Sequence, residues 1–256
     1  MGVVAAFACA LTLAVGLGLL LSPFLMHNGP TGIDQHVTDW FAGQRTHTWT
    51  HVMWRVTWLG SSVVVIPITV ITTIGLGWVH RGRLAAFVVA TVAGAALLNL
   101  LAKDIIGRNR PPVAVRLQHP HASSFPSGHS TQAAATYVAI GIVILALTRA
   151  RGTRLITWTI LAGAVIAVGV SRVYLGVHWT TDVIAGWIVG TAWALGGAFA
   201  FGFPGPQQPA DAGPCATFFA TRSPHPAPPA RIPARGLERV LQRRRDGAVE
   251  VGFDLP

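Results

Sequence analysis

Charged residues are scarce in this chain. Of its 256 residues, 11% are charged and 52% are hydrophobic, and the mean hydropathy is +0.52. An average soluble domain carries about 25% charged residues, so the composition excludes an ordinary soluble globular protein. It predicts an integral membrane protein instead.

Cysteine is equally rare. Cys9 lies in an apolar segment and Cys215 in a proline-rich stretch, so the two are too few and too scattered for a disulfide framework or a cysteine-based zinc site. Acidic residues are also few, and 9 of them against 19 lysines and arginines give a formal net charge of +10. Most arginines lie in short loops and in the C-terminal tail, which favours a membrane surface over nucleic acid as their partner.

Six hydrophobic segments approach the length of about 20 helical residues that crosses a bilayer. They span residues 3–25, 59–79, 84–101, 131–147, 155–170 and 183–203. Because the fourth and fifth are short, we expect their helices to continue into the polar residues beside them. The first lacks a basic start and exceeds the usual length of a signal-peptide core, so we interpret it as an uncleaved helix rather than a cleaved signal peptide.

The arginines also predict the orientation in the membrane. If the N-terminus is cytoplasmic, the inside loops at residues 80–83 and 149–154 and the inside C-terminal tail all carry arginines, as the positive-inside rule requires. The polar segments at residues 103–130 and 171–182 then face the extracytoplasmic side, and we expect the protein in the plasma membrane.

The C-terminal residues 205–256 are rich in proline, alanine and arginine. Their apolar content is too low for a hydrophobic core, so we predict a disordered cytoplasmic tail. A short basic helix over residues 236–246, lying on anionic lipid, is an alternative. The membrane domain is then residues 1–204.

Three polar stretches interrupt the hydrophobic sequence on the predicted outer side. They read KDIIGRNRP from Lys103, FPSGHS from Phe125 and SRVYLGVHWTTD from Ser171. Lys103 is the only lysine in the chain, beside 18 arginines. Because the chain uses arginine at every other position of this charge type, the single lysine favours a functional role for Lys103.

The residue types in these stretches suit a phosphate group. Lys103 offers a compact point charge, whereas Arg110 and Arg172 offer planar forks that can hold two phosphoryl oxygens at once. Ser127 adds a hydroxyl, and the backbone N–H groups around Gly128 can approach an anion closely because glycine has no Cβ.

Two histidines and an aspartate add the means for nucleophilic catalysis. His178 and Asp182 are four residues apart, so on a helix they would share a face and the carboxylate would accept a hydrogen bond from the ring. That bond fixes the tautomer and leaves the other ring nitrogen with a free lone pair for attack. His129 can then protonate the leaving alkoxide. A single interfacial histidine or arginine is more commonly a satisfied polar group, but the combination favours catalysis.

The ordered motifs K-x6-RP, PSGH and SR-x5-H-x3-D resemble the three-part signature of the type 2 phosphatidic acid phosphatase (PAP2) superfamily, which also includes the vanadium haloperoxidases. The resemblance covers about residues 58–203 and implies an all-α membrane bundle and a phosphatase that needs no metal or other cofactor. It implies that His178 is the nucleophile that forms a phosphohistidine, with Asp182 orienting it and His129 as the acid. The phosphate-binding roles then fall to Lys103, Arg110, Ser127, Gly128 and Arg172, while Ser171 matches a motif position of less defined role.

We therefore expect a six-helix membrane enzyme that removes a terminal phosphate from a lipid phosphate, with lipids and no nucleic acid as its partners. Phosphatidic acid, phosphatidylglycerophosphate and polyprenyl diphosphate are the candidate substrates. A phosphotransferase that uses a sugar or inositol hydroxyl remains an alternative. A non-enzymatic lipid-binding or transport protein is another, but it would not need both histidines. The six apolar segments disfavour a soluble haloperoxidase.

Other polar residues carry weaker signals. His47 and His51 are four apart and, with Asp39, could bind a metal, although an interfacial loop or helix is the simpler interpretation. Asn99, one turn before Lys103, either orients that lysine or bonds a neighbouring helix. His119 and His121 are interpreted as loop residues, and the tryptophans at 40, 49, 54 and 58 as an interfacial belt.

Overall fold

The computed structural model describes residues 32–120 and 122–203, together with positions 4, 5, 8, 12 and 16. These residues form helices and no strand, which confirms the predicted all-α fold. The elements in order are α2 (Gly32–Gly43), α3 (His47–Thr57), η2 (Trp58–Gly60), α4 (Ser62–Trp78), α5 (Gly82–Ile106), η3 (Val113–Val115), α6 (Gly128–Leu147), α7 (Arg151–Tyr174) and α8 (Thr180–Ala200).

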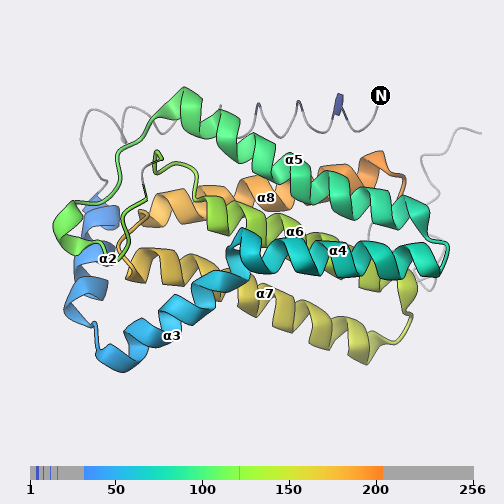
Figure 1. Ribbon diagram of the computed structural model, residues 1–256, viewed down its shortest axis with the longest axis horizontal. Coiled ribbons are helices and arrows are strands. Elements are labelled where there is room, and N and C mark those ends of the chain that lie inside the picture. The colour runs from blue at the N-terminus through green and yellow to red at the C-terminus, as the bar shows by residue number, and fades with distance from the viewer. Residues whose placement is uncertain are drawn as a thin grey trace, which may run out of the picture. The chain divides into compact units, whose positions relative to one another are not determined.

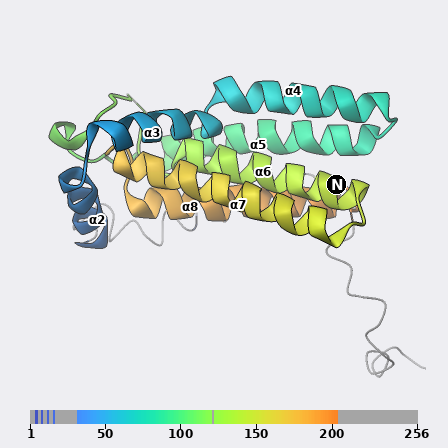
Figure 2. The same ribbon diagram turned by 90° about the horizontal axis from the view of Figure 1, so that it is seen from below.

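Four of the described helices, α5 to α8, are long and apolar enough to cross a membrane. They run alongside one another in an elongated bundle (Figures 1 and 2). The α3–η2 segment and α4 meet at a bend of 42° and would make a fifth span if they cross together. The first expected span, residues 3–25, is described only at the five single positions given above, and the expected tail, residues 205–256, lies outside the described residues.

The two short hydrophobic segments extend as predicted. The helix expected over residues 131–147 begins at Gly128, within the PSGH motif. The helix expected over residues 155–170 continues to Tyr174, so its last turn contains Arg172. Both polar motifs are therefore attached to the ends of membrane helices rather than to free loops.

Helix α6 is the central element of the bundle and packs against α5, α7 and α8. Its contact with α8 is very close, because a Cβ added at Gly190 would lie 2.4 Å from the carbonyl oxygen of Thr131. Ala134 and Ala135 of α6 are fully buried there, beside Gly190. Small residues allow helix backbones to approach within van der Waals contact, which is how membrane helices associate without a hydrophobic driving force.

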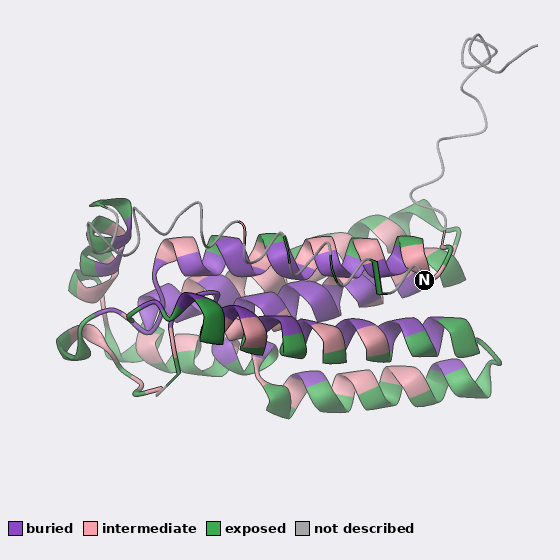
Figure 3. Ribbon diagram, turned by 90° about the horizontal axis from the view of Figure 1, so that it is seen from above, coloured by how far each residue is buried: buried purple, intermediate pink, exposed green. Residues whose placement is uncertain are grey.

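The outer surfaces of the bundle are strongly apolar. Exposed positions, green in Figure 3, recur along the outer faces of the helices. The exposed large hydrophobic residues include Ile71 on α4, Leu155 and Ile160 on α7, and Phe199 on α8. A water-soluble protein seldom exposes so much contiguous apolar surface. This surface agrees with an integral membrane protein.

Helices α2 and α3 precede η2 and α4. Of the interfacial loop or helix considered for His47 and His51, the helix is the one observed, because both residues lie on α3. Helix α2 packs against α7 and α8, and α3 against α7. In both ribbon views α2 lies across one end of the bundle (Figures 1 and 2). The four tryptophans at positions 40, 49, 54 and 58 are all exposed, so they are available for the interfacial role we predict for them.

Candidate active site

The three polar motifs meet at the end of the bundle that α2 covers. The first motif begins in the last turn of α5, the second leads into α6, and the third links α7 to α8. Helix α5 ends because Gly107 adopts a left-handed φ of 62°, a conformation that glycine adopts without steric cost. The N-termini of α6 and α8 both face this end, and their partial positive charge favours an anion.

His178 and Asp182 lie together, but not as we expected. We predicted a shared helix face, whereas His178 lies in the loop before α8 and only Asp182 is in the helix. The Asp182 carboxylate turns back to accept a hydrogen bond from the backbone N–H of Trp179 at 3.0 Å. This capping interaction places Asp182 Oδ2 3.5 Å from His178 Nδ1. The proximity therefore arises from the start of the helix and not from helical periodicity.

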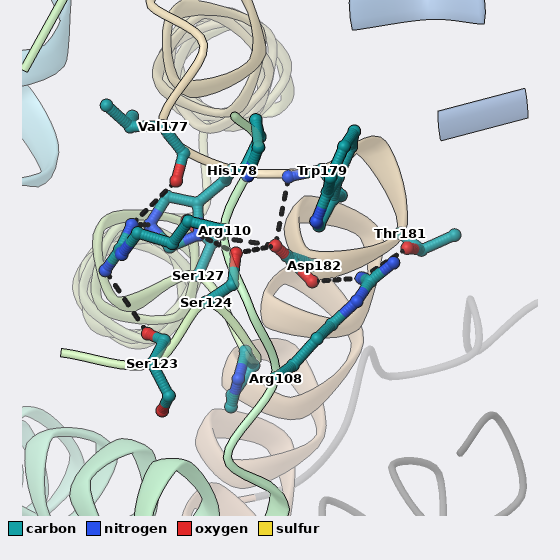
Figure 4. Close-up of polar contacts among 12 residues, drawn as sticks. Arg108, Arg110, Ser123, Ser124, Ser127, Val177, His178, Trp179, Thr181 and Asp182 are labelled. Carbon is teal, nitrogen blue, oxygen red and sulfur yellow. Dashed lines mark hydrogen bonds and ion pairs between the residues drawn. The ribbon is translucent and has the colours of Figure 1, made fainter. Parts of the chain in front are cut away.

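Ser124 lies between the two groups (Figure 4). Its hydroxyl donates to Asp182 Oδ2 and lies 3.5 Å from His178 Nδ1. Ser124 could not be identified from the sequence, because it stands between two motifs at a position that neither specifies. A serine beside the aspartate helps to fix the carboxylate in one orientation.

The His178 imidazole is buried, with 2% of its surface exposed. Burial lowers the pKa of His178 to about 3, although its hydrogen bond with Asp182 opposes this shift. The ring is therefore neutral at ordinary pH, which a nitrogen nucleophile requires. Its Nε2 atom lies 3.1 Å from Arg110 Nη1, so the nitrogen that would attack faces a cation.

Lys103 and Arg110 share an acceptor. Lys103 Nζ and Arg110 Nη2 both donate to the carbonyl oxygen of Ser123, which brings the two cations side by side. Arg110 also donates to the carbonyls of Ala122 and Val177, both at 2.7 Å. Burial lowers the pKa of Arg110 to about 10, so the guanidinium stays charged at neutral pH.

Arg172 completes the cationic cluster from the last turn of α7. It is 3% exposed, and its Nη1 donates to Thr57 Oγ1 at 2.8 Å and Gln118 Oε1 at 3.1 Å. Its Nε has no hydrogen-bond partner among the described residues. Buried donors are almost always paired, so this N–H is suited to an anionic ligand.

The PSGH segment lies against the aspartate. The backbone N–H of Ser127 donates to the carbonyl oxygen of Asp182 at 3.0 Å, and its hydroxyl accepts from Ser130. His129, in the first turn of α6, interacts electrostatically with Arg172, His178, Arg110 and Lys103. All eight candidate site residues therefore gather at this end of the bundle.

Asn99 contacts this segment as well. Its Nδ2 donates to Thr131 Oγ1 at 3.3 Å and to the Pro126 carbonyl at 3.4 Å. Of the two roles considered for Asn99, the bond to a neighbouring helix is therefore the one observed. It supports the backbone around Gly128 and does not bond Lys103.

Two further charged residues belong to the site and were missed. Arg108 is 2% exposed and contacts two carboxylates, bonding Asp182 Oδ1 through Nη1 and Asp34 Oδ2 through Nη2. It stands inside K-x6-RP, at a position that the motif leaves free. Asp34 precedes Arg108 by 74 residues, and the only signal for it was that acidic residues are rare in this chain.

The weaker metal hypothesis gains no support. The side chains of His47 and His51 are exposed on α3, with their Nε2 atoms 3.1 Å apart. Asp39, the third ligand considered, lies on a different helix, α2. Within the described residues, no three histidine, cysteine, aspartate or glutamate side chains are grouped to hold a metal ion. His119 is exposed in its loop, and His121 is outside the described residues.

Comparison with known proteins gives consistent matches. A family model described as the PAP2 superfamily matches residues 84–203. The chain is 32% identical over 173 residues to phosphatidylglycerophosphatase B of Bacillus subtilis (strain 168), covering 67% of this chain and 85% of that protein. It is 33% identical over 139 residues to an undecaprenyl-diphosphatase of Sulfolobus acidocaldarius, covering 52% of this chain and 61% of that protein.

A solved structure shares the architecture. The crystal structure of a transmembrane PAP2 type phosphatidylglycerolphosphate phosphatase from Bacillus subtilis superposes with a TM-score of 0.64 at 29% identity, covering 77% of this chain and 94% of that one. The structure of Aquifex aeolicus LpxE superposes with a TM-score of 0.53 at 21% identity, covering 66% of this chain and 94% of the other, which indicates a common fold.

Proposed function

The chain belongs to the PAP2 superfamily and is a membrane lipid phosphatase; on that basis we propose that it removes the terminal phosphate of phosphatidylglycerophosphate or a polyprenyl diphosphate through a covalent intermediate on His178. These two substrates are the ones for which the relatives described above are named. Phosphatidic acid, also expected from the motifs, is the third substrate to be tested.

The first step of the proposed reaction is attack by the Nε2 lone pair of neutral His178 on phosphorus. The P–N bond forms as the P–O bond to the lipid breaks, and His129 gives a proton to the leaving oxygen. Positive charge develops on the imidazole, and the Asp182 carboxylate beside Nδ1 stabilises it. In the second step His129 takes a proton from water, which attacks phosphorus, and the P–N bond breaks to release inorganic phosphate.

The cations stabilise the phosphoryl group during both steps. Arg110 donates to backbone carbonyls and lies against the nucleophile, so an arriving phosphate can take over part of its hydrogen bonding. Arg172 Nε, which has no hydrogen-bond partner in the described part of the chain, offers a further donor. Fixed donors aimed at developing charge are usually the largest single contribution to catalysis.

A single observation carries this proposal: a buried histidine has its Nε2 directed at the Arg110 guanidinium and its Nδ1 beside a carboxylate. This arrangement is suited to nucleophilic attack on an anionic group. A merely structural histidine would not need cations at one nitrogen and an anion at the other.

We further propose that the site faces the extracytoplasmic side of the plasma membrane. The arginine-bearing loops at residues 80–83 and 149–154 connect α4 to α5 and α6 to α7, at the end of the bundle away from the site (Figure 1). If those loops are cytoplasmic, the site is exposed on the other side. A lipid could then reach it with its tails still in the bilayer.

The test is a phosphate-release screen with the purified full-length protein. Phosphatidylglycerophosphate, a polyprenyl diphosphate and phosphatidic acid are each supplied in mixed micelles containing EDTA. We expect release from at least one of them, undiminished by EDTA, and none from His178→Ala. Wild-type turnover by His178→Ala would overturn the mechanism, and label transferred to an added inositol or sugar would identify a phosphotransferase.

A further inference from the structure

A buried chain of charges joins α2 to the dyad of His178 and Asp182. Asp34 and Asp182 are fully buried, and Arg108 between them is 2% exposed. Charges withdrawn from water are costly unless they are paired with good geometry. Burying three charged groups at this point costs desolvation free energy. Attachment of α2 to the bundle does not by itself require such a costly arrangement.

We propose that Asp34 is a positioning residue for the reaction, which acts through Arg108 on the Asp182 carboxylate and so couples α2 to His178. The inference rests on the function proposed above for His178 and Asp182. It assigns a role to a residue that lies outside the three motifs and before residues 84–203, the part of the chain that the family model matches.

Arg108 and Asp34 fix the orientation of the Asp182 carboxylate. The Asp182 carboxylate is held at both oxygens, Oδ1 by Arg108 and Oδ2 by the Trp179 N–H and the Ser124 hydroxyl. With Oδ1 fixed, the carboxylate cannot rotate away from His178 Nδ1. Arg108 is itself fixed, because its other amino group donates to Asp34 Oδ2 at 2.8 Å.

Asp34 also affects how much negative charge Asp182 can offer to His178. When His178 is phosphorylated, its ring gains positive charge, and the Asp182 carboxylate is the anion beside it. An Arg108 paired with Asp182 alone would cancel much of that negative charge. Asp34 supplies a second carboxylate to the same guanidinium, so Arg108 is shared and Asp182 keeps more of its charge for the imidazole.

Asp34 also binds the first turn of α8 directly. Asp34 Oδ1 accepts from the backbone N–H of Thr181 at 2.9 Å, and Oδ2 accepts from the Thr181 hydroxyl at 2.8 Å. That hydroxyl in turn accepts from Arg108 Nη1 at 2.8 Å. Asp34 therefore holds the residue adjacent to Asp182 as well as the cation that binds it.

A matched pair on α2 tests the proposal in the full-length enzyme. Asp34→Asn removes the charge but keeps an oxygen that can accept from Thr181, and Asp39→Asn makes the same change at an exposed position of the same helix. The measurement is the first-order rate constant for formation of the alkali-stable phosphoenzyme in a single turnover. A rate constant does not depend on the fraction of protein that is folded, so a loss of folded enzyme alone leaves it unchanged.

We expect Asp34→Asn to lower this rate constant roughly 10-fold to 100-fold, the range found when outer partners of a functional histidine are lost at metal sites. Because Asp34 does not face the phosphate-binding cations, we expect KM to change by less than about twofold. Asp39→Asn should match the wild type, and Asp34→Glu, which keeps the charge, should recover part of the rate.

The result that overturns the inference is a wild-type rate constant in Asp34→Asn. If that variant cannot be purified folded, Arg108→Lys decides, because one ammonium cannot hold two carboxylates in the geometry of a guanidinium fork. A wild-type rate constant in Arg108→Lys would equally overturn it. Failure of the proposed function looks different: the wild type itself would then form no phosphoenzyme and release no phosphate.

Discussion

The two ends of this helical bundle use arginine in different ways. At the end away from the site, the arginines in the loops at residues 80–83 and 149–154 are mostly exposed. Arg154 is half-buried and donates to the carbonyls of Leu145 and Thr148, which satisfies the end of α6. The exposed arginines interact with solvent, and Arg154 caps the C-terminal end of α6.

At the site end, two arginines are buried. Arg108 and Arg172 are 2% and 3% exposed, and their partners are carboxylates, hydroxyls and an amide. Residue type alone therefore does not identify a functional cation in this chain. Burial and the chemistry of the bonded partner do.

The largest effect is expected at the nucleophile. His178→Ala should lower turnover by about 1000-fold or more, because it removes the nitrogen that attacks phosphorus in the proposed first step. Asp182→Asn should keep measurable activity, since Asp182 orients His178 and does not attack. Arg81→Ala, at the opposite end, is the control and should turn over like the wild type. Initial rates of phosphate release measure all three, and an inactive Arg81→Ala would remove the distinction between the ends.

A smaller effect is expected on inhibition by vanadate. Five-coordinate vanadate resembles the transition state of phosphoryl transfer, so the cations that stabilise one should bind the other. We expect Arg172→Ala to raise the inhibitory vanadate concentration by about 100-fold, the usual cost of one aimed donor. Arg151→Ala, exposed at the far end, should leave it unchanged. Equal inhibition of the two variants would exclude Arg172 from the site.

The buried histidine should also make stability depend on pH. Burial lowers the pKa of His178 to about 3, below its ordinary value of about 6.5, so the folded protein binds fewer protons than the unfolded chain. The stabilisation is complete above pH 6.5 and is lost as pH falls toward 3. Between pH 7 and pH 5 the loss should be about 2 kcal/mol.

Thermal unfolding in detergent at these two pH values measures that loss. His178→Gln removes the titrating group, so its stability should decline less than that of the wild type on acidification. His80→Gln, exposed at the opposite end, serves as the control and should decline as the wild type does. An equal decline in all three proteins would show that His178 titrates normally.

Much of the bundle could be predicted from the sequence, because hydrophobic segments of bilayer length have few alternatives to membrane helices. The extension of α6 and α7 into the polar motifs followed from the same length argument. Helices α2 and α3 could not be predicted in this way. They are short, and the residues that they bury against the bundle, Asp34, Thr38 and Thr57, are polar, so no hydrophobic segment marks them in the sequence.

The residues of the site likewise fall into those that could be predicted from the sequence and those that could not. The motif residues could be named from the sequence, because their spacing carries the signal. The link from Asp34 to Arg108 could not, since it joins residues 74 positions apart and no periodicity connects them. The contact of His178 with Asp182 was expected for the wrong reason, because a carboxylate in the first turn of a helix can turn back to cap it, and this brings it to a residue outside the helix.

The prediction that disturbs the molecule least concerns which end faces out. Ala122 and Gly82 are both exposed, one in the loop beside the site and one at the start of α5. With Cys9 and Cys215 first replaced by serine, Ala122→Cys should react with a membrane-impermeant maleimide in intact cells, whereas Gly82→Cys should react only after permeabilisation. Neither substitution removes a side-chain contact, so phosphate release should persist in both variants and show that they are folded. The opposite labelling pattern would place the site in the cytoplasm, and the exposed arginines would then lie on the outer surface, against the rule that predicts their orientation.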